Sequence, residues 1–530
     1  MKTQLIGILR RTMGTAASLT TGIALLTLVA VLCPATSLGS SLFTFDNLTE
    51  DIGRGFGDSW NRYAFSMEEN DGHVYVGTWN IQFDYPLMAQ AISNGDLADI
   101  WATGNPLQGI GFLASEGAEV WRHDGGQNWT QVAKASPDNT GFRKMINYNG
   151  ELYTASANSE NGAGLWVKSD DASPQGESWA EVPWAAKNSN NNSIRALCTY
   201  TDQATGKELL YVGTENNEDG GELWTYDGTD WQLKEKFSDH AVSEVAVFKD
   251  KNGTENMYVG TWNFDVNLQG EPTDAFQLYA SPDGDSFANI KPDFAGREDL
   301  SNLGVMKLIE YKGKLFLGTV NYVDGFTLLS SDDPSNSNSW NVLTTDGFGD
   351  SDQAYSWSAA IVNDMLMVGT FSTGLNGGVY SDILPLLPMD GRAQLLYSTD
   401  GVNFAVMVDD GFGAEFNYGF RSMLASGDQL FIGTASNFFI PDGGSSLYDP
   451  YQLILGEYIA NLLGGIDFES LNLSPQDLEL YLARLFAGNG PFIGTQIWVG
   501  SAPVPEPATI LFLGTGLAGL AGSRLRRKKK

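Results

Sequence analysis

One short motif recurs along most of the chain and constrains the fold more than any other feature of the sequence. Its first copy, at residues 74–80, reads valine, tyrosine, valine, glycine, threonine, tryptophan, asparagine. The other copies lie at residues 152–158, 210–216, 257–263, 315–319, 366–370 and 430–434. Their central glycines, replaced by an alanine in the decayed copy at 152–158, are 47 to 78 residues apart. A strand and turn repeated at such a period indicates a repeat architecture.

Each copy belongs to a longer unit of four predicted strands. An apolar strand and a polar turn precede the motif, and two further strands follow it. Seven such units predict an all-β chain, a seven-bladed β-propeller over residues 38–501. After residues 496–499 the chain runs straight into the tail, so closing the ring needs an N-terminal strand near residues 42–45. A six-bladed ring with one copy outside it, or a stack of sheets, stays open.

A second repeat supports the strand register. Gly-Phe-Gly occurs at residues 55–57, 347–349 and 411–413, and a serine stands nine residues after the last glycine of each. These serines are Ser66, Ser358 and Ser422. We expect the three segments to be loops that enter the innermost strand. We also expect the Gly-Thr pair of the first motif to turn the chain.

The connections between second and third strands contain the long insertions. They cover roughly residues 81–116, 373–392 and 438–491, and the last is predicted to be a small helical hairpin whose second helix starts with a capping box at Ser474. In a propeller these connections open on the same face as the loops that enter the first strands. We therefore expect the insertions to decorate one face, and function to lie there.

Both ends of the chain have the composition of targeting segments. Basic residues at Lys2, Arg10 and Arg11 precede an apolar run, which predicts a signal peptide over residues 1–37. At the other end, Pro505, Glu506 and Pro507 precede an apolar stretch and a basic tail. The stretch predicts a transmembrane helix at 508–523, with the basic end in the cytoplasm.

The C-terminal 29 residues, 502–530, closely resemble the PEP-CTERM sorting signal of Gram-negative bacteria. The resemblance implies recognition by an exosortase, cleavage near Pro505–Pro507, and transient anchoring in the inner membrane through the helix. It also implies delivery to the cell surface or the extracellular matrix. The same tag is also labelled an ice-binding protein C-terminal domain, a label that describes the tag and does not argue for ice binding. An ordinary C-terminal anchor is the alternative.

Charge and residue usage narrow the function classes. The net charge of −33 repels phosphate backbones, so nucleic acid is a poor partner. Cys33 falls in the predicted leader, which leaves Cys198 alone and predicts no disulfide. The three histidines occupy unrelated repeat positions, which disfavours a histidine zinc site or a Ser-His-Asp relay. We assign no catalytic residue, no metal site and no cofactor, although the acidity could gather calcium.

Two sets of side chains are candidates for ligand binding. Asparagines that end the motif, chiefly Asn80, Asn216 and Asn263, should point to the insertion-bearing face, where amides suit sugar hydroxyls or tie down turns. Aligning the first strands places a second set near the axis: Phe65, Arg143, Arg195, Glu244, Met306, Trp357 and Arg421. Three arginines with a glutamate could bind a carboxylate, or could fill a channel as mutually satisfied Arg–Glu pairs.

Several turns between third and fourth strands, at residues 124–129, 281–287 and 398–404, resemble the Asp-box turns of sialidases and other BNR-repeat propellers. In those proteins the motif is structural, and sialidases clamp a sugar carboxylate with three arginines. This sequence departs from them because it has no Arg-Ile-Pro stretch in the first unit, seven units in place of six, and no Tyr-Glu nucleophile pair. The whole unit, over roughly residues 50–500, is similar to repeats in exported bacterial proteins of uncharacterised activity.

The leading hypothesis is therefore an exported, non-enzymatic surface or matrix protein that binds a glycan, such as exopolysaccharide, through its insertion-bearing face. A sialidase-like hydrolase or lyase acting on acidic sugars is the first alternative. A glycosidase needs two carboxylates that flank the bond it cleaves, and Glu244 is the one candidate that the sequence offers. Cation-dependent structural assembly is the second alternative, and it predicts that calcium raises the melting temperature.

Overall fold

A computed structural model describes eleven stretches of the chain. They are residues 43–83, 113–171, 173, 175–202, 205–216, 218–263, 275–292, 301–372, 392–414, 417–436 and 494–502. The predicted signal peptide (1–37), the helical insertion (438–491) and the transmembrane helix (508–523) lie outside these residues. Within them, no helix has the length and apolarity needed to cross a membrane.

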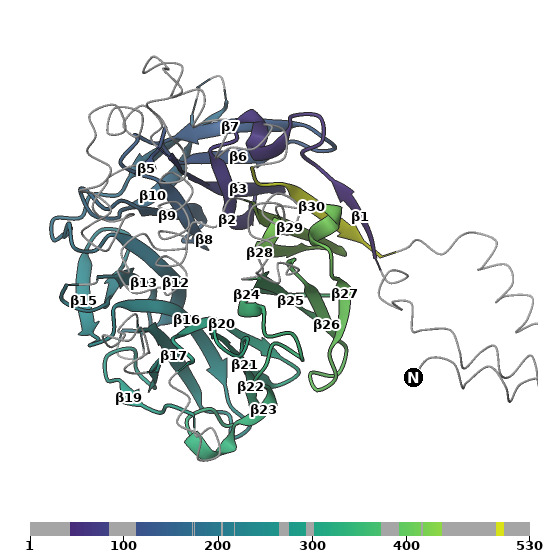
Figure 1. The fold of residues 1–530 in the computed structure, drawn as a ribbon. Helices are drawn as coiled ribbons and strands as arrows, with labels where there is room; N and C mark the ends of the chain where they lie inside the picture. The colour runs from purple at the N-terminus through teal and green to yellow at the C-terminus, as the bar shows by residue number, and fades with distance from the viewer. Residues whose placement is uncertain are drawn as a thin grey trace, which may run out of the picture.

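The described chain is all-β, with 28 strands in one closed, propeller-like antiparallel array (Figure 1). Pairing runs in successive groups of four consecutive strands, and the first strand of each group lies at the centre of the ring. The first group is β2 (Asn61–Asn70), β3 (His73–Asn80), β6 (Glu119–His123) and β7 (Trp129–Lys134). The second is β8 (Gly141–Tyr148), β9 (Glu151–Ala157), β10 (Leu165–Asp170) and β11 (Glu177–Glu181).

The next four groups repeat the same order. The third is β12 (Ser193–Thr201), β13 (Glu208–Glu215), β14 (Glu222–Tyr226) and β15 (Trp231–Lys236). The fourth is β16 (Ala241–Lys249), β17 (Glu255–Trp262), β18 (Leu278–Ser281) and β19 (Ala288–Asn289). The fifth is β20 (Gly304–Tyr311), β21 (Lys314–Val320), β22 (Leu328–Ser331) and β23 (Asn341–Thr344). The sixth is β24 (Gln353–Val362), β25 (Met365–Ser372), β26 (Leu395–Ser398) and β27 (Ala405–Val408).

The last group joins the two ends of the described chain. It consists of β28 (Asn417–Ser426), β29 (Gln429–Ser436), β30 (Ile497–Ser501) and, as its outermost member, β1 (Thr44–Asn47). Thr44 lies opposite Ser501, and Asn47 lies opposite Trp498. The N-terminal closing strand predicted near residues 42–45 is therefore confirmed.

The remaining described elements are short. β4 (Gln82–Phe83) pairs with β5 (Leu113–Ala114) in a separate sheet, and three 3₁₀ turns occur: η2 (Arg54–Gly57), η3 (Ser337–Ser339) and η4 (Gly411–Gly413). Two of these turns contain a Gly-Phe-Gly segment and precede an innermost strand, as predicted. The innermost strands start, and the motif strands end, on one face of the ring, which we call the entry face. The chain leaves the described residues there after Phe83, Asn263, Ser372 and Ser436.

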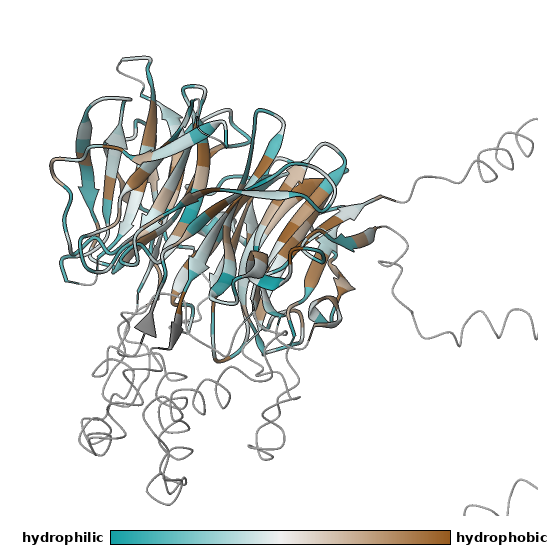
Figure 2. Cartoon of the chain, turned by 90° about the horizontal axis from the view of Figure 1, so that it is seen from above, coloured by the Kyte–Doolittle hydropathy of each residue, from teal (hydrophilic) through white to brown (hydrophobic). Residues whose placement is uncertain are grey.

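The motif strands read as continuous apolar runs because both of their faces are covered. In β13, every residue after Glu208 is buried, whereas the outermost strand β15 has no fully buried residue. Each hydrophobic cluster joins neighbouring groups; one combines Tyr75 and Val120 with Phe142 and Met145 of the next group. Figure 2 shows these hydrophobic residues along the strands of the ring wall.

The glycine of the motif allows neighbouring groups to approach closely. A Cβ added at Gly77 would lie 2.6 Å from the carbonyl oxygen of Phe142, and one at Gly260 would lie 2.5 Å from Val305. Both contacts are with the innermost strand of the next group, and Gly213, Gly318, Gly369 and Gly433 have similar ones. The expectation that Gly-Thr turns the chain is wrong, since both residues lie within the strand and serve packing and hydrogen bonding.

The threonine of the motif fixes the third strand. Thr78 Oγ1 accepts a hydrogen bond from the backbone N–H of Glu119 at 3.0 Å, and Thr434 Oγ1 accepts one from Gln496 at 2.8 Å. The same bond is made by Thr214, Thr261, Thr319 and Thr370, and by Ser156 in the decayed copy. The motif is thus a packing and hydrogen-bonding unit of the scaffold.

Candidate functional site at the centre of the ring

The innermost strands share a bulge that defines equivalent positions around the ring. In each, the register shifts by one just before the residue that pairs with the motif's glycine or alanine. The residues left unpaired are Phe65, Arg143, Arg195, Ser243, Met306, Trp357 and Arg421. The predicted alignment is therefore correct except at Glu244. That residue pairs with Gly260, one position farther along the strand, because the bulge falls at Ser243.

Arg143 and Arg421 lie against the same aromatic ring. Their Cζ atoms are 4.7 and 4.6 Å from the centre of the Phe65 ring, and Arg421 is also 5.1 Å from that of Trp357. All four side chains are buried. Cation–π contacts of this kind contribute about 0.5–2 kcal/mol each and hold the guanidinium planes in fixed orientations. Two arginines and Trp357 are thus brought together from three groups.

Arg195 is engaged elsewhere. Its Nη1 is 2.5 Å from Glu215 Oε2 in an ion pair whose side chains are 2% and 1% exposed, and its Cζ lies 4.4 Å from the Trp262 ring. Glu215 occupies the motif position that is tryptophan in the first and fourth groups. A glutamate in place of tryptophan at this motif position is the sequence signal for an internal partner of Arg195. The sequence analysis did not use that signal.

Glu244 joins two lysines that the sequence alignment missed. Its Oε2 accepts a hydrogen bond from Lys144 Nζ at 2.7 Å, and its Oε1 accepts one from Lys307 Nζ at 2.8 Å. The lysines occupy the equivalent register position in the second and fifth groups. Burial alone would raise the pKa of Glu244, but the two ammonium groups hold it below its ordinary value. Glu244 is therefore an ionised, doubly paired carboxylate.

The side chains of the motif asparagines Asn80 and Asn216 make hydrogen bonds to nearby backbone and side-chain groups. Asn80 Oδ1 accepts a hydrogen bond from the N–H of Glu116, while its Nδ2 donates to Asp58 and Asn61. Asn216 Oδ1 accepts from the N–H groups of Glu218 and Asp219, and its Nδ2 donates to Asn191. Asn263 is also buried. These contacts support the turn-tying role for Asn80 and Asn216.

A buried aromatic cluster surrounds the arginines and was not predicted. Tyr63 contacts Trp79, Trp357 and Tyr418, and its hydroxyl is hydrogen-bonded to that of Tyr418. Trp357 also packs edge-on against Tyr355 and Phe371. Its Nε1 has no hydrogen-bond partner among the described residues. No single repeat contains this cluster, since its members come from different groups.

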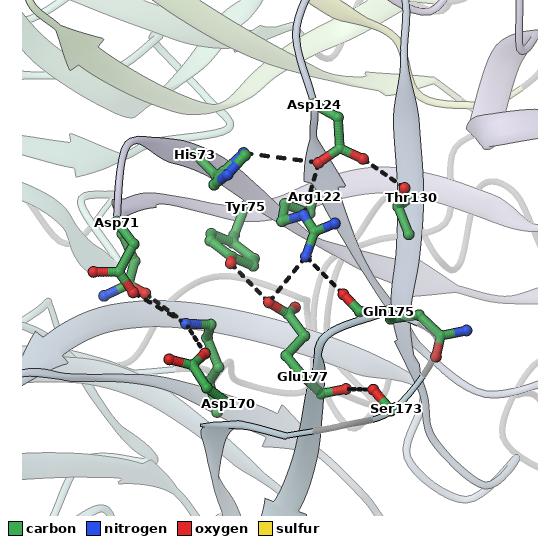
Figure 3. Close-up of polar contacts among 12 residues, drawn as sticks. Asp71, His73, Tyr75, Arg122, Asp124, Thr130, Asp170, Ser173, Gln175 and Glu177 are labelled. Carbon is green, nitrogen blue, oxygen red and sulfur yellow. Dashed lines mark hydrogen bonds and ion pairs between the residues drawn. The ribbon is translucent and has the colours of Figure 1, made fainter.

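A polar network on the outer strands connects the first two groups (Figure 3). Arg122 donates to Asp124 Oδ1 at 2.7 Å and to Glu177 Oε2 at 3.3 Å, and Tyr75 donates to the same Glu177 oxygen at 2.9 Å. Burial, followed by the Glu177 contact, raises the pKa of the Tyr75 hydroxyl. Lys168 Nζ bridges Asp71 and Asp170 at 3.2 and 2.9 Å. Every carboxylate here has a cationic partner, so the network serves to join the groups.

Two of the three turns compared with Asp boxes, at residues 281–287 and 398–404, are closed by their own aspartates. Asp283 Oδ1 accepts from the N–H groups of Asp285 and Ser286, and Asp400 Oδ1 accepts from those of Val402 and Asn403. These backbone bonds lower the pKa of both carboxyls. Across the described stretches, no group of three or more histidine, cysteine, aspartate or glutamate side chains could hold a metal ion.

One protein-family model matches the chain. The PEP-CTERM protein-sorting motif matches residues 503–527. The chain carries an exosortase-type sorting signal. The motif indicates export and delivery to the cell surface, and it covers the C-terminal tail alone. None of the curated proteins matches the chain.

Similar solved structures include propellers and enzymes. The chain is 11% identical to the Dos1 propeller over 61% of this chain and 72% of that one, with a TM-score of 0.36. It is 12% identical to a puromycin hydrolase over 71% and 50% of the two chains, with a TM-score of 0.39. It is 11% identical to a luciferin-regenerating enzyme over 66% of this chain and 87% of that one, with a TM-score of 0.33. Similarity this low carries no inference about the activity or ligand of this chain.

Proposed function

We propose that this chain is an exported, non-enzymatic surface or matrix protein, a seven-bladed propeller that binds an acidic glycan such as exopolysaccharide at its entry face. The sorting motif at 503–527 supplies the route to the surface. The groups of four strands, closed by β1, support the count of seven blades over residues 38–501. A signal peptide at 1–37 and transient anchoring through 508–523 complete the proposal.

The observation that carries the glycan proposal is the pair of arginines held on aromatic rings at the bulges of the innermost strands. Arg143 and Arg421 share the Phe65 ring, and Trp357 lies beside them. Guanidinium groups bind carboxylates through paired hydrogen bonds, and the two rings hold them in place. We assign Arg195 and Glu244 to support because each has an internal ionic partner. Asn80, Asn216 and Asn263 shape the entry face.

Retention on immobilised exopolysaccharide from the host tests the proposal. We expect the body of the protein to be retained, and Arg143→Ala with Arg421→Ala to weaken retention about tenfold or more. Lys312→Ala is the matched control, because Lys312 lies in an exposed turn and pairs with Asp364. If wild type is not retained, or if the double variant behaves as wild type, the arginine site is refuted.

Two further measurements separate the alternatives. Release of reducing ends from a panel of acidic oligosaccharides would favour a hydrolase or lyase. A melting temperature that rises with calcium and falls back with a chelator would favour cation-dependent assembly. We expect neither response from a protein that binds glycan through arginines.

A further inference from the structure

The ionic cluster formed by Lys144, Glu244 and Lys307 lies across the centre of the ring. The three residues are on β8, β16 and β20, the innermost strands of the second, fourth and fifth groups. The third group lies between Lys144 and Glu244 in chain order, and it has Ala196 at the equivalent register position. The small alanine leaves the lysine free to reach a carboxylate two groups away. The contact therefore joins the innermost strands of two groups that are not neighbours.

The cluster contains more positive than negative charge. Two ammonium groups share one carboxylate, so the three side chains carry a net charge of +1 when all are ionised. Burial, opposed by Glu244 and reinforced by Lys307 and Arg421, lowers the pKa of Lys144 to about 8. Cys198 lies near enough for Glu244 to act on it, but burial is the main cause that raises the pKa of its thiol to about 12, so it remains neutral. No negative charge from Cys198 offsets the lysines.

The ammonium groups also retain donor capacity. An ammonium has three N–H donors, and Glu244 is the hydrogen-bond partner of both lysines among the described residues. Each lysine side chain is 27% exposed, whereas Glu244 is 7% exposed. Two partly exposed lysines with unused donors among the described residues, beside a covered carboxylate, form an arrangement suited to an oxyanion.

We propose that Lys144 and Lys307, held in position by Glu244, form a binding site for a small oxyanion, of carboxylate or sulfate chemistry, at the centre of the ring. Glu244 is a positioning residue that keeps the two ammonium groups at a fixed separation. The site is one residue farther along the innermost strand than Arg143. This oxyanion site does not depend on glycan binding at the entry face, because a free anion could bind to the two lysines as well as the acid group of a sugar.

Calorimetric titration of the purified body at constant ionic strength tests the site. Sulfate, acetate and glucuronate are the probes, and chloride is the reference salt that reports ionic strength alone. We expect saturable binding of at least one oxyanion and a melting temperature raised by about 2 °C or more at saturation. Sulfate or acetate binding without glucuronate binding would identify a free-anion site. Glucuronate binding would place the acid group of a sugar there.

Variants of each member of the cluster make the test specific. Lys144→Met or Lys307→Met should weaken oxyanion binding at least tenfold. Glu244→Gln should also weaken it at neutral pH, because Glu244 holds both ammonium groups and opposes the lowering of the Lys144 pKa. Lys251→Met is the matched control, since that lysine is half-exposed and pairs with Asp332. Affinity should also fall above about pH 8.

The result that would overturn the proposal is equally definite. If wild type and Glu244→Gln both respond to sulfate, acetate and glucuronate as they do to chloride, the cluster only links the innermost strands and no anion site exists. Loss of binding in Lys251→Met as well would also refute it, because the effect would then be unspecific. Should either lysine variant fail to fold, the wild-type and Glu244→Gln titrations still decide the question.

Discussion

Serine hydroxyls on the innermost strands of the first, sixth and seventh groups hold each of these groups to the next. Ser66 donates to the carbonyl oxygen of Phe142 at 2.8 Å, Ser358 to that of Phe420 at 2.6 Å, and Ser422 to that of Ala64 at 2.7 Å. In each case the acceptor immediately precedes the bulge of the following group. The regular spacing from Gly-Phe-Gly to serine is therefore a structural requirement of the ring.

We predict that Ser422→Ala lowers the free energy of unfolding by about 1–3 kcal/mol, because it removes the hydrogen bond and leaves a buried carbonyl group without its partner. Denaturant unfolding measures the change. Ser426→Ala, at the end of the same strand and only partly buried, is the control and should cost less than about 0.5 kcal/mol. Equal losses in the two variants would contradict the assigned role.

Glu68 provides a second residue-scale prediction, which concerns pH. Burial, with a smaller contribution from the charge of Glu69, raises its pKa to about 7. Between about pH 4.5 and 7 the folded state thus binds more protons at this site than the unfolded state, so its contribution to stability falls as pH rises through that window. Glu68→Gln should raise the melting temperature at pH 8 and change it little at pH 4. A shift independent of pH would contradict the assignment.

At the scale of elements, β1 matters more than its length suggests. It is four residues long, yet it completes the outer edge of the last group by pairing with β30, more than 450 positions away in the chain. Phe43, just before β1, is buried among Ala360, Met407 and Phe420. Closure of the ring therefore depends on a short N-terminal segment. This segment can pair only once the C-terminal strand β30 is present.

We predict that Phe43→Ala lowers the free energy of unfolding by about 3–5 kcal/mol, since it empties a buried site and loosens the closing strand. Phe45→Ala is the matched control in the same segment; its ring is only partly buried and should cost less. Denaturant unfolding of both variants measures the difference. The closing role of this segment is refuted if the Phe45 variant loses as much stability as the Phe43 variant.

At the scale of the whole molecule, the described chain ends, at Ser501 and Ala502, on the side of the ring opposite the entry face. Ser501 pairs with Gln429 at the start of β29, whereas the chain leaves β29 on the entry face at Ser436. The sorting motif begins at residue 503, directly after Ala502. A protein held by its C-terminal tail should therefore turn its entry face away from the attachment point.

Cysteine labelling of the anchored precursor measures this orientation. We expect Glu160→Cys, in the connection after β9 on the entry face, to react with a bulky membrane-impermeant maleimide several times faster than Asp428→Cys, in the hairpin before β29. The parent chain is the background control, because burial keeps the Cys198 thiol protonated. Equal rates, or faster reaction at position 428, would contradict the orientation.

The sequence by itself determined the repeated unit, the all-β class, the closing strand and the sorting signal. All four depend on short-range patterns, namely apolar runs, glycines at fixed spacing and a composition shift at the C-terminus. Only the tertiary structure decided which side chains meet at the centre. The partners of Arg195, Glu244 and Phe65 lie 20 to 356 residues away. A one-residue bulge in β16 also moved Glu244 out of the aligned position. Because a bulge changes side-chain direction without changing the apolar pattern, no reading of a single repeat could place that carboxylate between two lysines.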